Sequence, residues 1–394
     1  MDKISKRASS LLLILTIASS YLMWIVGIDT KITAFIYSNS MYFLLAIIGL
    51  VLMLNLQRME KGDWGIILFA ISIFVFYTLT SSIRHSNRFI NGVIPVIILL
   101  VLCFKLCKFD KWDKAILLGV SGVSLVTILL RLYVELPKLI PTDMIGKMGN
   151  KIETIWINTN TIGAALLFSV LMTSILIKNF TVGYYRLIVI PIYLLGGFGI
   201  WAVESKTAFM VLILFVFIDN LIPKTFLQKN KWWVVLFIGV FLIAPLISYH
   251  FSQSATMSLF TERERIWKEL FGKLFSNNQN VLIGMQPFVA SWKPLGTHNS
   301  FLNILANYGV IGYLIITGLF SYWLIQMMLQ KRNYSKIQVS LTLAFLIIWM
   351  HSLMEDIMTA YHWMPIIYSF IGIALQKPDD LLKQEKSLRS NKKR

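Results

Sequence analysis

A short polar segment late in the 394-residue chain carries its most suggestive histidine. His298 follows Thr297 and precedes Asn299, and either neighbour is a good N-cap, so the ring is expected at or near the first turn of a helix. Gly309 is expected to stop or bend this helix before the next span. The dipole of that helix disfavours the imidazolium ion and leaves a neutral ring that can accept a proton. A single histidine in a loop is usually an ordinary surface residue, so this spacing alone is weak support for a catalytic His298.

Two arginines begin the most regular polar sequence of the chain, residues 260–275. Thr261 and Glu264 have the spacing of a capping box, and six apolar residues then recur in pairs, which predicts an amphipathic helix. These apolar residues are Ile266, Trp267, Leu270, Phe271, Leu274 and Phe275. Such a helix can lie in the membrane interface, with Arg263 and Arg265 at headgroup depth. A planar guanidinium suits phosphate binding; the alternative is that both arginines pair with neighbouring glutamates or lipid headgroups.

Two further groups of polar residues lie at the ends of apolar runs. Lys206, in Glu204-Ser-Lys206-Thr-Ala, can neutralise a phosphate or simply extend its amine to the membrane interface. His351 and Glu355 fall one turn apart on a predicted helix, where they can form a hydrogen-bonded pair or bind sugar hydroxyls. The alternative for this pair is a purely structural cap at the end of a membrane span.

Metal-binding and nucleotide-binding patterns are missing from the sequence. The five histidines are scattered, with neither H-x-x-x-H nor H-E-x-x-H, and there is no Walker loop. We therefore expect chemistry that needs no metal and no cofactor, on a substrate that is already activated.

The elements that must position these residues are membrane helices. The chain is 57% hydrophobic and only 14% charged, with a mean hydropathy of +0.69. Soluble domains are about a quarter charged. This composition excludes a soluble enzyme, a disordered chain and a secreted disulfide scaffold. Cys103 and Cys107 lie close together beside lysines, which argues against a structural disulfide.

Twelve long apolar runs predict an all-α integral membrane protein, with about 12 transmembrane helices in a single polytopic domain, residues 1–394. The first run follows a basic N-terminus but has no small-x-small cleavage site, so we expect a retained helix rather than a signal peptide. The runs are 10–28, 41–57, 64–81, 89–105, 115–133, 161–178, 185–202, 207–222, 232–249, 309–329, 337–354 and 360–376.

The distribution of basic residues predicts the orientation of these helices. With the N-terminus in the cytoplasm, 24 of the 37 lysines and arginines fall on cytoplasmic segments, and the cytoplasmic face has the larger net positive charge. Both termini are therefore expected in the cytoplasm, including a basic tail over residues 377–394. One large extracytoplasmic loop with short amphipathic helices, about 250–298, is expected between spans 9 and 10. The charge indicates no nucleic-acid partner, because no basic soluble domain is present to hold one.

The segment from Thr297 to Gly312 resembles the signature of the O-antigen ligase and O-antigen polymerase superfamily, which are membrane glycosyltransferases of the bacterial envelope. It reads Thr-His-Asn-Ser-Phe-Leu-Asn-Ile-Leu-Ala-Asn-Tyr-Gly-Val-Ile-Gly. Three further segments match in the expected order. Asn158-Thr-Asn160 resembles the family's Asn-Pro-Asn, Ser205-Lys-Thr-Ala208 its Ser-Arg-Thr-Ala, and Arg263-Glu-Arg-Ile-Trp267 its Gly-Arg-x-x-Ile-Trp.

The resemblance covers residues from about 158 to 360 and departs from the family pattern at two positions. Lys206 stands where the family usually has arginine, so the charge is kept but the bidentate fork is lost. Glu262 precedes Arg263 where glycine is common.

The resemblance implies glycan transfer from a polyprenyl-diphosphate carrier to an acceptor glycan hydroxyl, with inversion, at the outer leaflet of the bacterial cytoplasmic membrane. The active site would then face the periplasm or the cell exterior. His298 would be the base, and Arg263 with Lys206 would stabilise the leaving diphosphate, with Arg265 in reserve. The other expected contacts to diphosphate or glycan are Asn160, Asn299, His351 and Glu355.

Three activities are compatible with these features. A polymerase, which joins repeat units of O-antigen or capsule, is favoured because residues 351–363 resemble polymerases more closely. A ligase uses the same donor but hands the glycan to lipid A–core or another terminal acceptor. A lipid-linked oligosaccharide flippase is the candidate of another class; the middles of the predicted spans carry few ionisable groups, which favours surface chemistry. The lipid bilayer is an expected partner, and a chain-length regulator is a further candidate.

Overall fold

The computed structural model describes residues 2–26, 30–135, 159–181, 183–253, 263–293, 295–329 and 335–376. In this part of the chain all regular secondary structure is helical, and eight helices are long and apolar enough to cross a membrane. Each of the twelve apolar runs falls mainly on a helix, so the predicted all-α architecture is confirmed. The predicted basic tail, 377–394, lies outside the described residues.

Twelve helices carry the apolar runs, and shorter helices connect them. The twelve are α1 (Asp2–Val26), α3 (Ser40–Asn55), α4 (Lys61–Leu79), α7 (Val93–Leu106), α8 (Lys111–Glu135), α9 (Thr159–Phe180), α10 (Val189–Ala202), α11 (Lys206–Leu221), α13 (Trp232–Ser252), α16 (Ser300–Leu329), α17 (Lys336–His351) and α18 (Met364–Ala374). The connecting α-helices are α2 (Lys31–Ser38), α5 (Ser81–Arg84), α6 (Arg88–Asn91), α12 (Lys224–Lys229), α14 (Arg263–Phe275) and α15 (Asn278–Ile283). Two 3₁₀ segments, Leu56–Arg58 and Gly183–Ile188, complete the order.

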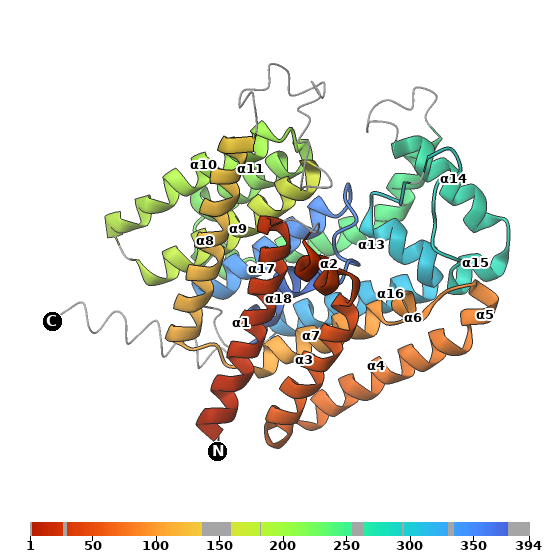
Figure 1. The fold of residues 1–394 in the computed structure, drawn as a ribbon, viewed down its shortest axis with the longest axis horizontal. Helices are drawn as coiled ribbons and strands as arrows, with labels where there is room; N and C mark the ends of the chain where they lie inside the picture. The colour runs from red at the N-terminus through yellow and green to blue at the C-terminus, as the bar shows by residue number, and fades with distance from the viewer. Residues whose placement is uncertain are drawn as a thin grey trace.

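Helices α17 and α18 form the centre of the bundle (Figure 1). Every residue of α18 is buried, and so is almost every residue of α17. A helix that is apolar all round must be enclosed by other elements, and α7, α9 and α11 pack against this pair. The segment that links the two helices, residues 352–363, is therefore held by the core of the protein at both of its ends.

The outer helices, in contrast, expose apolar side chains. On α4, Leu68, Ile71, Val75 and Leu79 recur along one side and are all exposed. A continuous apolar stripe of this kind is unfavourable in water and ordinary against lipid tails. The packing thus supports the membrane location that the composition predicts.

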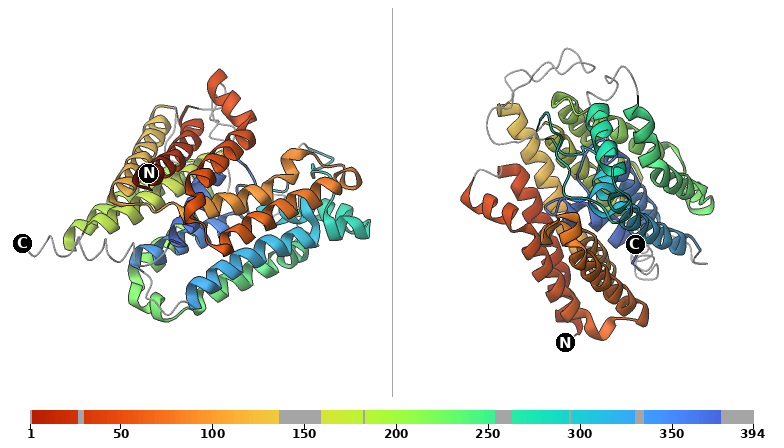
Figure 2. Two further views of the ribbon diagram at one scale, coloured as in Figure 1. Left: turned by 90° about the horizontal axis from the view of Figure 1, so that it is seen from below. Right: turned by 90° about the vertical axis from the view of Figure 1, so that its right-hand side faces the viewer.

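Helices α13 and α16 pack side by side in opposite directions, and α14 with α15 lies at one end of this pair (Figures 1 and 2). Helix α14 confirms the amphipathic helix predicted over 260–275. Of its six predicted apolar residues, five are buried and Phe275 is 56% exposed. The buried stripe faces protein, because α14 packs on α13 and α15. Thr261 of the predicted capping box lies outside the described residues.

Helix α16 is broken at Gly309, which the sequence predicts as a stop or hinge. Its φ of +64° and ψ of −169° are accessible almost only to glycine. Three consecutive carbonyls before the break accept hydrogen bonds from other segments. Ala306 accepts from the N–H of Met285 at 2.7 Å, Asn307 from Arg84 Nη1 at 2.7 Å, and Tyr308 from the hydroxyl of Tyr77 at 2.8 Å. Because apolar surroundings offer these carbonyls no water, such partners fix the position of the break.

We predict that Gly309→Ala lowers the free energy of unfolding by about 2 kcal/mol or more, since a side chain is strained in this backbone conformation. The new methyl group would also lie 2.3 Å from the carbonyl oxygen of Leu282. Gly318→Ala is the matched control, because Gly318 lies in the same helix with open space around it. Thermal unfolding of both purified variants in detergent measures the effect, and equal melting temperatures would show that the break is not constrained.

Candidate functional site

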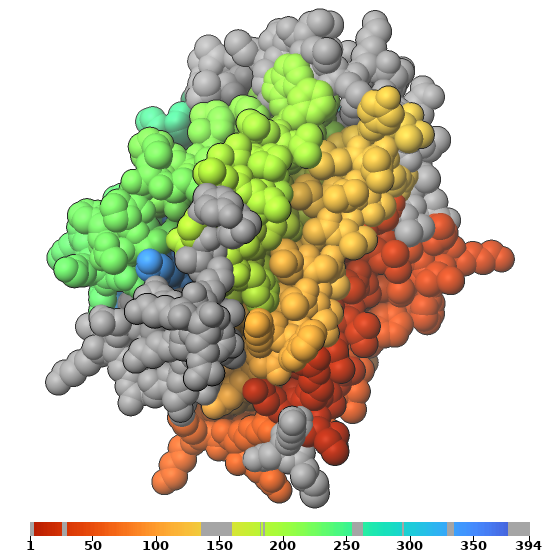
Figure 3. Space-filling model, turned by 90° about the vertical axis from the view of Figure 1, so that its left-hand side faces the viewer, coloured from red at the N-terminus to blue at the C-terminus, as the bar shows by residue number. Residues whose placement is uncertain are grey.

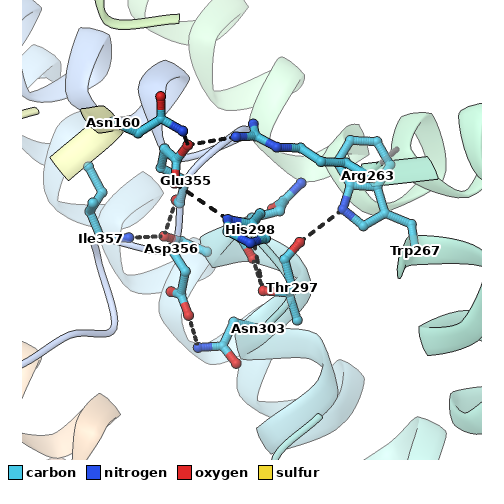
Figure 4. Close-up of polar contacts among 11 residues, drawn as sticks. Asn160, Arg263, Trp267, Thr297, His298, Asn303, Glu355, Asp356 and Ile357 are labelled. Carbon is cyan, nitrogen blue, oxygen red and sulfur yellow. Dashed lines mark hydrogen bonds and ion pairs between the residues drawn. The ribbon is translucent and has the colours of Figure 1, made fainter. Parts of the chain in front are cut away.

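The carboxylate of Glu355 joins three of the predicted site residues (Figure 4). Its Oε1 atom accepts hydrogen bonds from Arg263 Nη2 and Asn160 Nδ2, each at 2.6 Å. Its Oε2 atom lies 3.6 Å from His298 Nδ1. The Arg263 and Glu355 side chains are mostly buried, with 13% and 12% of their surface exposed. One carboxylate therefore connects a cation, an amide and an imidazole that are far apart in the sequence.

These residues meet because the ends of several helices lie together. Asn160 lies in the first turn of α9, and Arg263 is the first residue of α14. His298 comes two residues before the start of α16, and Glu355 lies in the non-helical segment between α17 and α18. The site is thus assembled from positions at which backbone direction changes, where side chains from different helices can converge.

The backbone holds His298 in a left-handed conformation, with φ of +48°. Residues other than glycine rarely adopt this conformation, and such strain occurs often at functional sites. On one side, the Asn299 side chain caps α16 by accepting two backbone N–H groups of the first turn. On the other side, the Thr297 carbonyl accepts a hydrogen bond from Trp267 Nε1 at 3.0 Å. His298 is therefore held between a helix cap and an anchor on α14.

Asn299 stabilises the start of α16. Besides capping α16, its amide nitrogen lies 3.3 Å from Ser248 Oγ, and the residue is only 1% exposed. The sequence predicts Asn299 as a helix cap or as a substrate contact, and its hydrogen bonds in the structure are those of a cap.

Ser300 fixes the segment that carries Glu355. Its hydroxyl donates to the carbonyl oxygen of Glu355 at 3.0 Å and accepts from the N–H groups of Ile357 and Met358. Its own N–H donates to the carbonyl of Ser352 at 2.9 Å. These bonds tie the start of α16 to the turn after α17, so the His298 and Glu355 backbones are positioned together.

The predicted helical pair of His351 and Glu355 is wrong. Helix α17 ends at His351: the next N–H groups, of Leu353 and Met354, donate to carbonyls three residues back, and the Ser352 carbonyl accepts from the N–H of Ser300. His351 is completely buried, and neither ring nitrogen has a hydrogen-bond partner among the residues that the structure describes. It therefore offers no open surface to a glycan, in contrast to the expected sugar contact.

The neighbouring carboxyl groups of Glu355 and Asp356 have pKa values that are shifted in opposite directions. Burial raises the pKa of Glu355, but the neighbouring His298 and the charge of Arg263 outweigh burial and hold this pKa below its ordinary value. Glu355 is therefore ionised at neutral pH. Burial raises the pKa of Asp356 to about 6, although a hydrogen bond from Thr359 opposes the shift. The site thus contains one firmly charged carboxylate beside one that titrates near pH 6.

Arg265 is placed differently from Arg263. It is exposed, and its guanidinium lies over the ring of Trp292, 4.4 Å from the ring centroid. A cation–π contact of this kind accounts for its position without a phosphate. Arg263 is the arginine that points to Glu355 (Figure 4).

Lys206 begins α11 at the same end of the bundle as Asn160. The preceding residue, Ser205, packs so closely on Gly163 of α9 that a methyl group there would lie 2.3 Å from the serine side chain. Gly163 follows Asn160 by one helical turn. Lys206 is therefore near the site's edge, although no contact between it and the Glu355 carboxylate is found.

Asn303 and Asp356 belong to the site and were missed by the sequence reasoning. Asn303 Nδ2 donates to Asp356 Oδ2 at 2.6 Å and to Thr359 Oγ1 at 2.8 Å. Asn307 Nδ2 in turn donates to Asn303 Oδ1 at 2.7 Å. The signal was present in the sequence, because Asn299, Asn303 and Asn307 recur every four residues and so lie on one helix face.

Comparison with known proteins finds no matching protein-family model and no significantly similar curated protein. Within the described part of the chain, no three histidine, cysteine, aspartate or glutamate side chains come together as metal ligands. The groups that the site offers are an imidazole, a paired guanidinium, two carboxyls and several amides. Together they can bind an anion, accept a proton and hold polar hydroxyl groups.

We predict that Asp356→Asn changes the pH dependence of stability. The folded protein binds the Asp356 proton more tightly than the unfolded chain, because the pKa rises from 3.8 to about 6 on folding. The contribution of Asp356 is therefore fully present below about pH 4 and is lost as the pH rises through about 6. An asparagine cannot lose that proton.

Melting temperatures measured from pH 4.5 to 7.5 test this sign. The free energy of unfolding of the variant should increase relative to that of the wild type as the pH rises, by about 1–2 kcal/mol in total. This difference should level off above about pH 6.5. A difference in stability that does not vary with pH would show that folding does not raise the pKa of Asp356.

Proposed function

We propose that this chain is a polymerase of envelope polysaccharide repeat units, of O-antigen or capsule, that transfers a glycan from polyprenyl diphosphate to an acceptor sugar hydroxyl. The observation that carries this proposal is the Glu355 carboxylate, which joins Arg263 to His298. A base and a cation tied to one carboxylate supply the two functions that such a transfer needs. The resemblance of residues 158–360 to the O-antigen ligase and polymerase superfamily supports the same reaction.

In this reaction His298 is the general base. Its Nδ1 atom faces Glu355, so Nε2 is the atom left for the acceptor hydroxyl. The carboxylate favours the tautomer protonated on Nδ1 and stabilises the imidazolium that forms when the hydroxyl proton reaches Nε2. With 26% of its side chain exposed, His298 is more accessible than Arg263 or Glu355, which suits a group that meets the acceptor.

The acceptor oxygen then forms a bond to the anomeric carbon while the bond from that carbon to the diphosphate oxygen breaks. The electron pair goes to the diphosphate, where negative charge grows. Arg263 and Lys206 are the cations that stabilise this charge. A guanidinium has five N–H donors, so Arg263 can bind phosphate oxygens while one N–H group holds Glu355. Attack opposite the leaving group inverts the anomeric centre, and the diphosphate leaves without a nucleotide being consumed.

The position of the site at one end of the bundle suits a lipid-linked donor. Helices α9 and α11 begin there and α17 ends there. In the proposed topology, with twelve spans and both termini cytoplasmic, this end faces the periplasm or the cell exterior. The donor's polyprenyl chain then stays in the outer leaflet of the bacterial cytoplasmic membrane while its diphosphate reaches Arg263.

A ligase would use the same residues with a different acceptor, and glycan size in a deletion strain separates the two. Single repeat units on the terminal acceptor are expected for a lost polymerase, whereas long chains left on the carrier lipid would indicate a ligase. Movement of lipid-linked glycan across liposomes without glycan joining would instead identify a flippase.

We predict that His298→Ala lowers the rate of glycan joining by at least about 100-fold, because the acceptor hydroxyl loses its base. Purified protein with a synthetic lipid-linked donor provides the assay, and the melting temperature confirms folding. His250→Ala, at the exposed end of α13, is the control and should retain activity. A folded His298→Ala variant with normal turnover would rule out His298 as the general base.

We also predict that Arg263→Lys lowers the rate about tenfold or more although the charge is kept, because lysine cannot hold Glu355 and a phosphate with one planar group. Arg265→Lys, on the same helix, is the matched control, since Arg265 stacks on Trp292 and should tolerate the change. Equal rates for the two variants would mean that Arg263 is a bystander.

A further inference from the structure

A large cavity of the described structure lies at the other end of the helices that form the site. Its volume is about 790 Å³, and it lies between the end of α9, the start of α10, the end of α11 and the start of α17. Since α9 and α11 begin near Glu355 and α17 ends there, the cavity and the site are separated by the length of these helices. Sixteen helical residues span about 24 Å, close to the thickness of a bilayer's hydrocarbon core.

Four cations and one carboxylate line this cavity, which we call the basic pocket. The cations are Lys178, Arg186, Lys224 and Lys336, and the carboxylate is Asp219. Asp219 is wholly buried and already saturated: it accepts bonds from Lys178 at 2.6 Å, from Lys224, and from Ser340 Oγ at 2.8 Å. The pocket therefore has an excess of positive charge that its own carboxylate does not balance.

Part of the wall of the basic pocket is apolar and faces the outside of the bundle. Leu187, Ile190 and Leu194 line it and are 61%, 47% and 67% exposed. In a membrane protein such side chains face lipid tails. Figure 3 looks onto this side of the molecule, where the green surface of the helices after α9 adjoins a small blue patch from the C-terminal part of the chain.

We propose that the basic pocket binds an anionic phospholipid. The headgroup phosphate contacts Arg186 and Lys336 at the rim, and the acyl chains follow the exposed apolar wall on α10. Basic pockets between membrane helices at the cytoplasmic side are suited to anionic headgroups, because charge attraction adds to burial of the chains. A cavity of this volume accommodates a headgroup of drug-like size. This inference does not depend on the proposed glycan transfer.

Arg186 and Lys336 are the residues to change, because Lys178 and Lys224 are needed to neutralise buried Asp219. The double variant Arg186→Gln/Lys336→Gln removes the rim charges and leaves that cluster intact. Lys229→Gln is the matched control, since Lys229 is an exposed cation on neighbouring α12 that does not line the pocket. Melting temperatures of all three proteins in detergent without added lipid establish that they are folded.

The test adds phosphatidylglycerol, phosphatidylcholine or inorganic phosphate to each protein and measures the melting temperature, with bound lipid counted by native mass spectrometry. We expect phosphatidylglycerol to raise the melting temperature of the wild type and Lys229→Gln by several degrees, and to do so far less in the double variant. Equal shifts with phosphatidylcholine, or equal shifts in all three proteins, would overturn the proposal. A shift with inorganic phosphate as large as that with phosphatidylglycerol would also overturn it, because the pocket would then be a site for a soluble anion.

Discussion

The buried carboxylate of Glu355 is the interaction on which the rest of the site depends. A carboxylate withdrawn from water is costly unless charged and hydrogen-bonding partners surround it. Asn160, Arg263 and His298 provide those partners, and each comes from a different helix end. Removal of any partner would leave a charge that the others must compensate. The four residues therefore form one unit, which exists only when the helix ends are correctly packed.

Helix α16 gives this unit its fixed position. At its start, Ser300 bonds to the segment of Glu355, and Asn299 caps the helix directly after His298. Nine residues later the helix breaks at Gly309, where Arg84 and Tyr77 bond the carbonyls before the break. The short first part of α16 is therefore held at both ends, so His298 can be kept in a strained conformation that a freely moving loop would relax.

The sequence predicts the helices and caps that carry the site residues, but it does not predict that these residues come together around Glu355. Apolar periodicity predicts the helices, including α14 with its buried face, because the apolar residues of one helix face recur at regular spacing within a single segment. The spacing around His298 and Gly309 predicts a cap and a break for the same local reason. The central role of Glu355 was not predictable, because its partner Asn160 is 195 positions away and its place depends on α17 ending at His351. The Ser352 carbonyl directly after that end accepts a hydrogen bond from Ser300, which is a tertiary contact.

The charge balance around Glu355 suggests how the two halves of the proposed reaction are coupled. In the structure the Glu355 carboxylate lies between Arg263 and His298. When His298 takes the acceptor's proton, the new imidazolium competes for the same carboxylate, which weakens its hold on the guanidinium. Arg263 then has more of its charge available for the diphosphate at the moment when negative charge grows there. A single carboxylate between base and cation can thus link proton removal at the acceptor to stabilisation of the leaving group, which two separate ion pairs could not do.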